Sequence, residues 1–255
     1  ESTVVRFASS IGYSGYPEFQ KALESLVRSK LNSSDRPAIT NGGIEQNGVL
    51  REVLSADALK IKNTMENIDE AAFENAVEVI SNAKRIYVVG IRTCAPLASF
   101  LSFYLNMIFD NVVNLQTSSS SELFEQMIRI SDEDCIIGIS FPRYSMRTLK
   151  ALEFANNRQA KVITITDSIH SPMNLYSSCN LIAESDMHSV VDSLVAPLSV
   201  INALVVELCI RKQTEVAKTL EMVEDVWSEY QFYENDEIDM VDDSIKMIYP
   251  ERNDG

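Results

Sequence analysis

The stretch from Asp134 to Ser168, DCIIGISFPRYSMRTLKALEFANNRQAKVITITDS, decides the fold that this chain is expected to adopt. Its apolar run Cys135 to Ile139 is too short for a helix and is bounded like a buried strand. A helix is predicted from about Ser145 to Asn157, and a second buried strand from Lys161 to Thr166. Strand, helix and strand in this order form a β-α-β unit, which implies parallel pairing and a right-handed crossover.

Polar side chains are concentrated in the turn between the first of these strands and the helix. Ser140, Ser145 and Thr148 surround Arg143 there. Ligands of parallel sheets bind beyond the carboxyl ends of the strands, and hydroxyls, an arginine and a helix amino terminus suit an anion such as phosphate. Ser145 could equally serve only as a helix cap. Because three hydroxyls and an arginine share one strand end, we predict an anion site.

The same pattern occurs upstream, and it extends the prediction to a whole domain. A strand predicted at 86–89 is followed by Gly90, Arg92 and Thr93, and then by a helix over about 95–109. Arg92 could be a surface charge, but its place directly after a strand makes it and Thr93 candidate ligand contacts. Further strands are predicted at 112–115 and 179–183, and further helices at 49–65, 70–82, 189–212 and onward to about 232. This alternation predicts a three-layer αβα domain with a mainly parallel sheet of about five strands.

The amino-terminal part has a different, all-helical pattern. Residues 1–12 show an apolar stripe of helical spacing that Gly12 would end, and a second helix is expected from Pro17 to about Leu31. Polar residues with Pro37 and a glycine pair follow, which is typical of a linker. The predicted organisation is a partial all-α segment at 1–31, a linker at 32–48, the α/β domain at 49–235 and an acidic tail at 236–255.

Composition excludes several classes of protein. The net charge of −15 argues against a whole chain adapted to nucleic acid, and 45% apolar residues indicate a globular protein. The charge is uneven: residues 1–51 hold six Lys/Arg and five Asp/Glu, whereas residues 221–255 hold two and twelve. The most apolar long segment, 193–210, contains Pro197, Asn202 and Glu207, so we interpret it as a buried or dimer-facing helix and not as a membrane span.

The residues that usually carry chemistry do not form a pattern in this sequence. The four cysteines match no metal-ligand spacing, and Cys135 and Cys179 lie in apolar runs, so no metal or cofactor is predicted. The only histidines, His170 and His188, lie in predicted loops, and Glu184 is a single carboxylate after a strand. Because no acid/base pair can be named, no catalytic residue is assigned, which favours a sensor over an enzyme.

Three stretches carry a resemblance to a known family. IYVVGIRTCAPLA (86–98) and CIIGISFPRYSMRTLKALEFA (135–155), the latter followed by AKVITITDS (160–168), resemble the signature loops of the sugar isomerase (SIS) domain. TVVRFASSIGYSGYPEFQKAL (3–23) resembles the end of the helix-turn-helix domain of RpiR-type transcriptional regulators. The resemblance implies that the SIS domain senses a phosphorylated sugar and that the amino-terminal domain binds operator DNA as part of a homodimer or homotetramer.

The second signature loop departs from the family pattern Ser-x-Ser-Gly-x-Thr. Ser140 holds the first position, Pro142 and Arg143 replace the second serine and the glycine, and Ser145 replaces the threonine. Pro142 removes a backbone donor, while Arg143 adds a fork of donors suited to phosphate. In the first loop, Arg92 and Thr93 stand where the family usually has small residues and a serine. We therefore expect a retained pocket that is adapted to a more anionic ligand.

The resemblance also suggests residues that bind DNA. Glu1 to Ile11 resembles a recognition helix, so the chain is expected to begin inside the DNA-binding domain. Ser2, Thr3 and Arg6 would face DNA, with Arg6 contacting a phosphate or a guanine, although spacing alone also fits an ordinary solvated helix face. The predicted function is a cytoplasmic, bacterial-type transcriptional regulator. The alternatives are a sugar-phosphate isomerase or related lyase, and a ligand-binding SIS protein without DNA binding.

Overall fold

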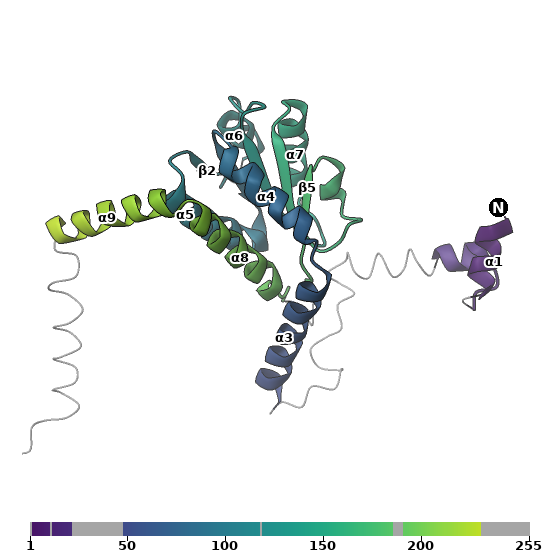
Figure 1. The fold of residues 1–255 in the computed structure, drawn as a ribbon. Helices are drawn as coiled ribbons and strands as arrows, with labels where there is room; N and C mark the ends of the chain where they lie inside the picture. Colours follow the sequence, from purple (N-terminus) through teal and green to yellow (C-terminus); the bar gives the residue numbers. More distant parts are fainter. Residues whose placement is uncertain (1, 11, 22–47, 118, 186–190, 231–255) are drawn as a thin grey trace, which may run out of the picture.

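Five short strands form one sheet in the order β2-β1-β3-β4-β5, and all four pairings between neighbours are parallel (Figure 1). A computed structural model describes residues 2–10, 12–21, 48–117, 119–185 and 191–230. The sequence prediction of a mainly parallel, five-stranded sheet is confirmed. The strands are β1 (Ile86–Gly90), β2 (Val112–Asn114), β3 (Cys135–Ile139), β4 (Lys161–Thr166) and β5 (Cys179–Ile182).

The central strands are apolar on both faces because helices cover both sides of the sheet. Every residue of β1 and of β3 is buried, as expected for strands inside a parallel sheet. Alternate residues enter two separate cores: Ile86 and Val88 pack on one face, and Tyr87 and Val89 on the other. The sheet is thus the middle layer of a three-layer domain.

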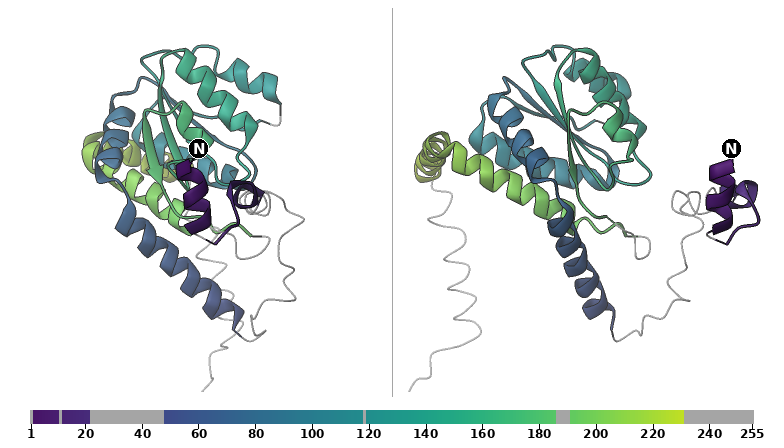
Figure 2. Two further views of the ribbon diagram at one scale, coloured as in Figure 1. Left: turned by 90° about the vertical axis from the view of Figure 1, so that its right-hand side faces the viewer. Right: turned by 45° about the vertical axis from the view of Figure 1, so that its right-hand side comes forward.

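Helices from distant parts of the chain form the two outer layers (Figure 2). One core joins the sheet to α4 (Glu70–Asn82), α5 (Ala95–Ile108) and α8 (Val195–Arg211). The other core joins it to α6 (Ser120–Gln126) and α7 (Met146–Asn157). Two further helices extend from the domain: α3 (Val49–Asn67) contacts α8, and α9 (Gln213–Tyr230) contacts α5 and α8.

The start of α8 differs from the sequence prediction. A helix was expected from about residue 189, but α8 begins at Val195. Pro197 is the third residue of the helix, within the first turn, where a missing backbone N–H costs no intrahelical hydrogen bond. Ahead of the helix, the side chains of Asp192 and Ser193 bind groups on other elements. Pro197 therefore marks the first turn of α8, although the apolar pattern alone predicts an earlier start.

The amino-terminal helix also forms where the sequence predicts it. Helix α1 (Ser2–Ser10) is followed by Gly12, whose φ of 97° lies in the left-handed region, and residues 16–21 are helical. Phe7 and Tyr13 pack edge-on against Phe19. The rest of the predicted second helix, the linker up to residue 47 and the tail at 236–255 lie outside the described residues. None of the helices among the described residues has both the length and the apolar character of a membrane span.

Candidate functional site

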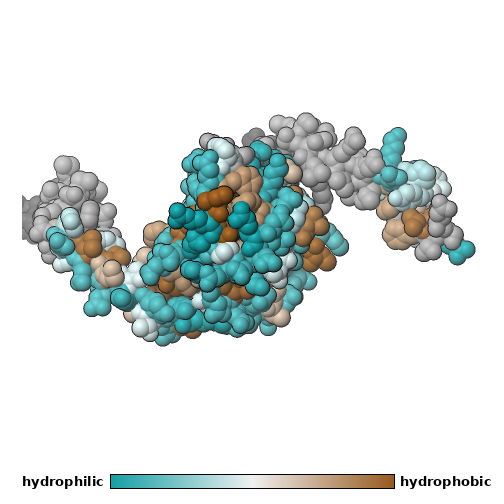
Figure 3. All heavy atoms as spheres, turned by 90° about the horizontal axis from the view of Figure 1, so that it is seen from above, coloured by the Kyte–Doolittle hydropathy of each residue, from teal (hydrophilic) through white to brown (hydrophobic). Residues whose placement is uncertain are grey.

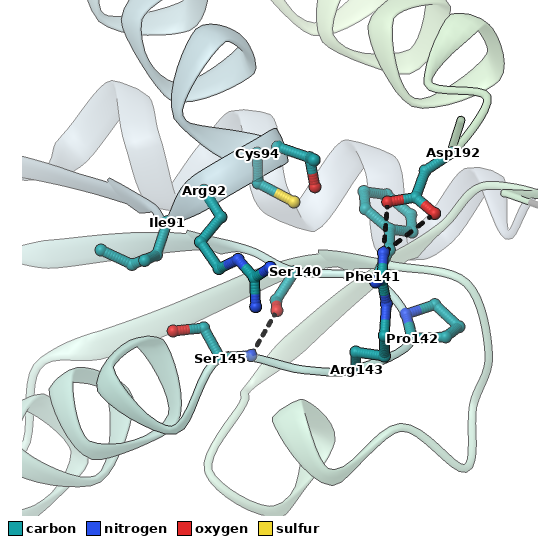
Figure 4. Close-up of a pocket in the computed structure, with 10 residues that line it drawn as sticks. Ile91, Arg92, Cys94, Ser140, Phe141, Pro142, Arg143, Ser145 and Asp192 are labelled. Carbon is teal, nitrogen blue, oxygen red and sulfur yellow. Dashed lines mark hydrogen bonds and ion pairs between the residues drawn. The ribbon is translucent and has the colours of Figure 1, made fainter. Parts of the chain in front are cut away.

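A pocket lies where the order of the strands reverses. From β1 the chain runs to β2 on one side and then returns to β3 on the other side, so the connections after β1 and β3 diverge. Parallel sheets bind ligands at such a point, beyond the carboxyl ends of the strands. Figure 4 shows the pocket there. Its lining residues come from the two loops and from the segment before α8: Ile91, Arg92, Thr93, Cys94, Ser140, Phe141, Pro142, Arg143, Ser145 and Asp192.

The structure brings together five of the six residues that the sequence suggested as ligand contacts. They are Arg92, Thr93, Ser140, Arg143 and Ser145. The sixth, Thr148, is not among the lining residues: it is fully buried within α7, and its Oγ1 has no hydrogen-bond partner among the described residues. Its backbone N–H donates to Ser145 Oγ at 3.4 Å. Thr148 is thus one of the buried residues of α7, which spacing in the sequence does not reveal.

The two serines of the second loop hold each other and the helix in place. Ser140 Oγ accepts a hydrogen bond of 3.1 Å from the backbone N–H of Ser145, and Ser145 is the N-cap of α7. Ser145 Oγ in turn accepts from the backbone N–H of Thr148. Because both hydroxyl oxygens act as acceptors, the O–H groups of Ser140 and Ser145 remain able to donate to a ligand. The capping role and a ligand-binding role are therefore compatible at the same residues.

Both arginines of the pocket have unusual backbone conformations. Arg92 has a φ of 60° and Arg143 a φ of 70°, in the left-handed region that residues other than glycine rarely occupy. At Arg143 this accounts for the family pattern, because glycine, which the pattern has there, adopts this conformation readily. Such strained residues are concentrated at functional sites. The side chain of Arg92 is directed towards Ser140 and Ser145 (Figure 4).

The pocket contains one acidic residue that the sequence analysis did not identify. Arg143 Nη2 donates to both carboxylate oxygens of Asp192, at 3.3 and 3.0 Å. The two residues are 49 positions apart, so no local motif joins them. With two arginines and one aspartate, the lining side chains carry a net single positive charge. That charge fits an anionic ligand.

Other polar groups near the pocket have structural roles. Burial raises the pKa of the Cys94 thiol to about 11, so this thiol is neutral near pH 7 and is a poor nucleophile. Tyr144 donates to Asp167 Oδ1 at 2.8 Å, which joins the loop after β3 to the end of β4. Burial, and secondly this hydrogen bond, raise the pKa of Tyr144.

The candidate acid/base groups do not meet in the pocket. Glu184 is absent from its lining, and the backbone N–H of Glu184 donates to Thr64 Oγ1 on α3. His170 is exposed, and His188 lies outside the described residues. All four cysteines are free thiols, and the described residues contain no group of three His, Cys, Asp or Glu that could hold a metal ion.

The residues suggested to bind DNA are all on α1. Ser2, Thr3 and Arg6 belong to this helix, and Arg6 is exposed. The helix also exposes Val4, Val5 and Phe7, while Ala8 is fully buried. Helix α1 thus exposes one arginine and three large apolar side chains.

Comparison with known proteins identifies the family of the domain that contains the pocket. Residues 79–207 match the SIS domain family. An uncharacterized HTH-type transcriptional regulator, CPE0189 of Clostridium perfringens, is 24% identical over 185 residues, which cover 71% of this chain and 64% of that protein. The chain thus spans slightly less than two thirds of this relative.

Two solved structures share the fold. The sugar isomerase domain of an RpiR transcription factor from Sphaerobacter thermophilus has a TM-score of 0.67 at 28% identity, covering 70% of this chain and 99% of that one. The Vibrio vulnificus NanR protein, solved in complex with ManNAc-6P, has a TM-score of 0.61 at 20% identity, covering 88% and 81%. The family match extends over the strands and helices that build the pocket. The chain therefore belongs to the SIS domain family and is similar to transcriptional regulators of the RpiR type.

Proposed function

We propose that this protein is a transcriptional regulator whose SIS domain, within residues 49–235, binds a phosphorylated sugar in the pocket at the ends of β1 and β3. The observation that carries the proposal is the convergence of two arginines and two serine hydroxyls on one small pocket with a net positive charge. A fold relative whose structure was solved with ManNAc-6P supports the choice of a sugar phosphate. DNA binding by residues 1–31, action in the bacterial cytoplasm and assembly into a homo-oligomer belong to the same proposal.

The arrangement suits a phosphate group in four ways. Arg143 supplies a planar fork of donors that matches phosphate oxygens. Ser140 and Ser145 offer hydroxyl donors beside it, and the amino terminus of α7, which Ser145 caps, adds a partial positive charge. Arg92 approaches the same serines from the loop after β1 (Figure 4). The sugar ring would then extend from the phosphate into the remainder of the pocket.

A thermal-shift screen tests the ligand. Sugar phosphates should raise the melting temperature of the protein, whereas each parent sugar without phosphate should leave it unchanged, because the pocket residues recognise the anion. Equal shifts from a sugar and its phosphate would contradict the proposed role of the arginines and serines. The absence of any shift across hexose, pentose and amino-sugar phosphates would contradict the proposed function.

We expect no turnover of aldose or ketose phosphates. An isomerase needs an acid/base pair within hydrogen-bond distance of the substrate, and no described pocket residue forms such a pair. The measurement is NMR-detected proton exchange at the sugar C2 position in deuterated water. Protein-dependent exchange that is lost in the Glu184→Gln variant would instead favour the isomerase alternative.

Two contacting helices expose apolar residues that we assign to contacts with a second copy of the chain. On α8, Val206 and Ile210 are 56% and 55% exposed and one turn apart, and Phe103 on the neighbouring α5 is 63% exposed. The face seen in Figure 3 is in contrast mainly hydrophilic, with hydrophobic residues in small patches. Homo-oligomers are usually two-fold symmetric, and such symmetry also suits a palindromic operator.

Sedimentation velocity at micromolar concentration should therefore show a dimer or a larger assembly. The Val206→Asp variant should shift the protein towards the monomer, because it places a charge in the apolar contact. Ile128→Asp is the matched control, since Ile128 is also exposed but follows α6 on the opposite face of the sheet. A wild-type protein that is monomeric at every concentration would contradict this assignment.

Arg6 gives a direct test of DNA binding. On an operator duplex recovered by selection, Arg6→Ala should weaken binding by ~1–3 kcal/mol and relax specificity at one position if Arg6 contacts a base. If Arg6 contacts a phosphate, the loss of affinity should be the same for all DNA sequences. The slope of the logarithm of the binding constant against the logarithm of the salt concentration should then fall by about one. Fluorescence anisotropy distinguishes the two cases. Unchanged affinity and specificity would remove α1 from the DNA-binding surface.

A further inference from the structure

The pocket already contains an anion, which is the carboxylate of Asp192. Its side chain is 13% exposed and forms the ion pair with Arg143, which is itself 24% exposed (Figure 4). The carboxylate thus occupies the donor Nη2 with both of its oxygens. A phosphate that is to bind Arg143 through this nitrogen has to replace the carboxylate or share the donor with it.

The Asp192 carboxylate leaves one donor of the Arg143 guanidinium unsatisfied. The backbone of Arg143 has the left-handed φ of 70°, on a loop that is fixed at its far end by the bond between Ser145 N–H and Ser140 Oγ. Its Nε is buried and has no hydrogen-bond partner among the described residues. The guanidinium therefore retains a buried donor that an incoming anion could satisfy. Asp192 does not satisfy that donor.

The residue after Asp192 connects the pocket to another part of the molecule. Ser193 Oγ donates to Asp57 Oδ1 on α3 at 2.7 Å, and the carbonyl of Ser193 accepts a hydrogen bond of 3.0 Å from Ser185 Oγ. On α3, Asp57 also lies 3.8 Å from the Nζ of Lys60, whose side chain is 5% exposed. Asp192 thus binds Arg143 of the pocket, and the next residue, Ser193, binds Asp57 of α3.

Helix α3 is the element through which such a connection would reach the amino-terminal segment. It begins at Val49, directly after the predicted linker of residues 32–48. It contacts the domain through α8 and through the bond between Thr64 and Glu184 at the end of β5. A movement of Asp192 and Ser193 would therefore act on the first helix of the SIS domain.

We propose that Asp192 is an internal competitor of the ligand for Arg143, and that its displacement by the ligand phosphate is transmitted through Ser193 to α3. This inference rests on the proposed function, because it assumes that the ligand of the pocket is a phosphate compound. The inference gives one role to Asp192 and another to Ser193. Asp192 sets the affinity for the anion, and Ser193 links an occupied pocket to the segment that leads to α1.

The first test measures affinity for inorganic phosphate by NMR titration of the full chain. Asp192→Asn should bind phosphate about fivefold more tightly than the wild type, the size expected for the loss of one partly exposed ion pair. Asp192→Glu, which keeps the charge, should bind no more tightly than the wild type. Glu133→Gln is the matched control, because it removes one acidic partner of an ion pair, with Lys84, at the opposite edge of the sheet. It should bind phosphate like the wild type.

The second test follows the backbone amides of α3 in the same titration. Phosphate should shift the signals around Asp57 in the wild type. Ser193→Ala should bind phosphate with unchanged affinity but lose most of those shifts, because it lacks the bond to Asp57. Full α3 shifts in Ser193→Ala would overturn the transmission to α3.

The outcomes separate this inference from the proposed function. Unchanged or weaker phosphate binding in Asp192→Asn, beside a wild type that binds sugar phosphates, overturns the competitor role and leaves the proposed function in place. Weaker binding in particular would make Asp192 a direct ligand contact. If neither inorganic phosphate nor any sugar phosphate perturbs the pocket of the wild type, both the inference and the proposed function fail.

Discussion

Replacing Ser140 and Ser145 together by alanine should remove most of the stabilisation that the ligand gives to the protein. A ligand present at a hundredfold its dissociation constant adds ~2.7 kcal/mol to the free energy of unfolding. Hydrogen bonds to a charged group contribute ~1.5–3 kcal/mol each, so the loss of two should weaken binding at least about a hundredfold. At the same ligand concentration, the stabilisation would then fall to about 0.4 kcal/mol. Differential scanning calorimetry with and without ligand measures this difference.

The structure shows why the variant needs a control for folding. Ser145 caps α7 and Ser140 accepts the amide of Ser145, so the double variant should also lower the stability of the free protein, by ~1 kcal/mol for the cap. Ser119→Ala is the matched control, because Ser119 caps α6 and is absent from the pocket lining. It should lower the stability of the free protein and keep the full ligand shift. A double variant that also keeps the full shift would place the site elsewhere.

The strands and most helices could be predicted from the sequence because they depend on local patterns. A short, continuous apolar run predicts a strand of a sheet that is covered on both faces. The fully buried β1 and β3 are such strands. The cap of α7 at Ser145 was also visible, because capping joins residues three positions apart. The start of α8 was placed too early because an apolar pattern does not show which residues are held by other elements.

The pocket was only partly predictable for the same physical reason. The two loops could be placed together because the carboxyl ends of parallel strands meet at one edge of the sheet. Asp192 enters from a segment 49 residues after Arg143, and only the folded chain shows that the two side chains meet. From the sequence, Thr148 is expected in the hydroxyl cluster, but it is buried within α7 and is not among the residues that line the pocket. Local motifs therefore predict the two loops of the pocket. They do not predict the ion pair between Arg143 and Asp192, which lowers the net charge of the pocket.

The second large effect is expected at Gly90, where the polypeptide leaves β1. A Cβ atom at this position would lie 2.5 Å from the carbonyl oxygen of Cys94 and 3.0 Å from the Cβ of Ala98. The short helix η2 (Arg92–Cys94) folds back over the end of the strand, and only glycine leaves room for it. Because the obstructing oxygen is a backbone atom, no side-chain rotation can relieve the clash.

Gly90→Ala should therefore lower the free energy of unfolding by up to about 3 kcal/mol, the upper range for an overpacked core, in urea denaturation. It should also weaken ligand binding, because the displaced η2 carries Arg92 and Thr93 of the pocket. Gly138→Ala is the matched control: it is also a buried strand glycine, but the three atoms nearest to its added Cβ belong to the side chain of Leu152, the closest at 2.8 Å, and not to the backbone. The control should lose less stability and keep its affinity for the ligand. If both variants lose affinity equally, the effect arises from general loosening of the sheet and the packing of η2 against Gly90 does not position the pocket.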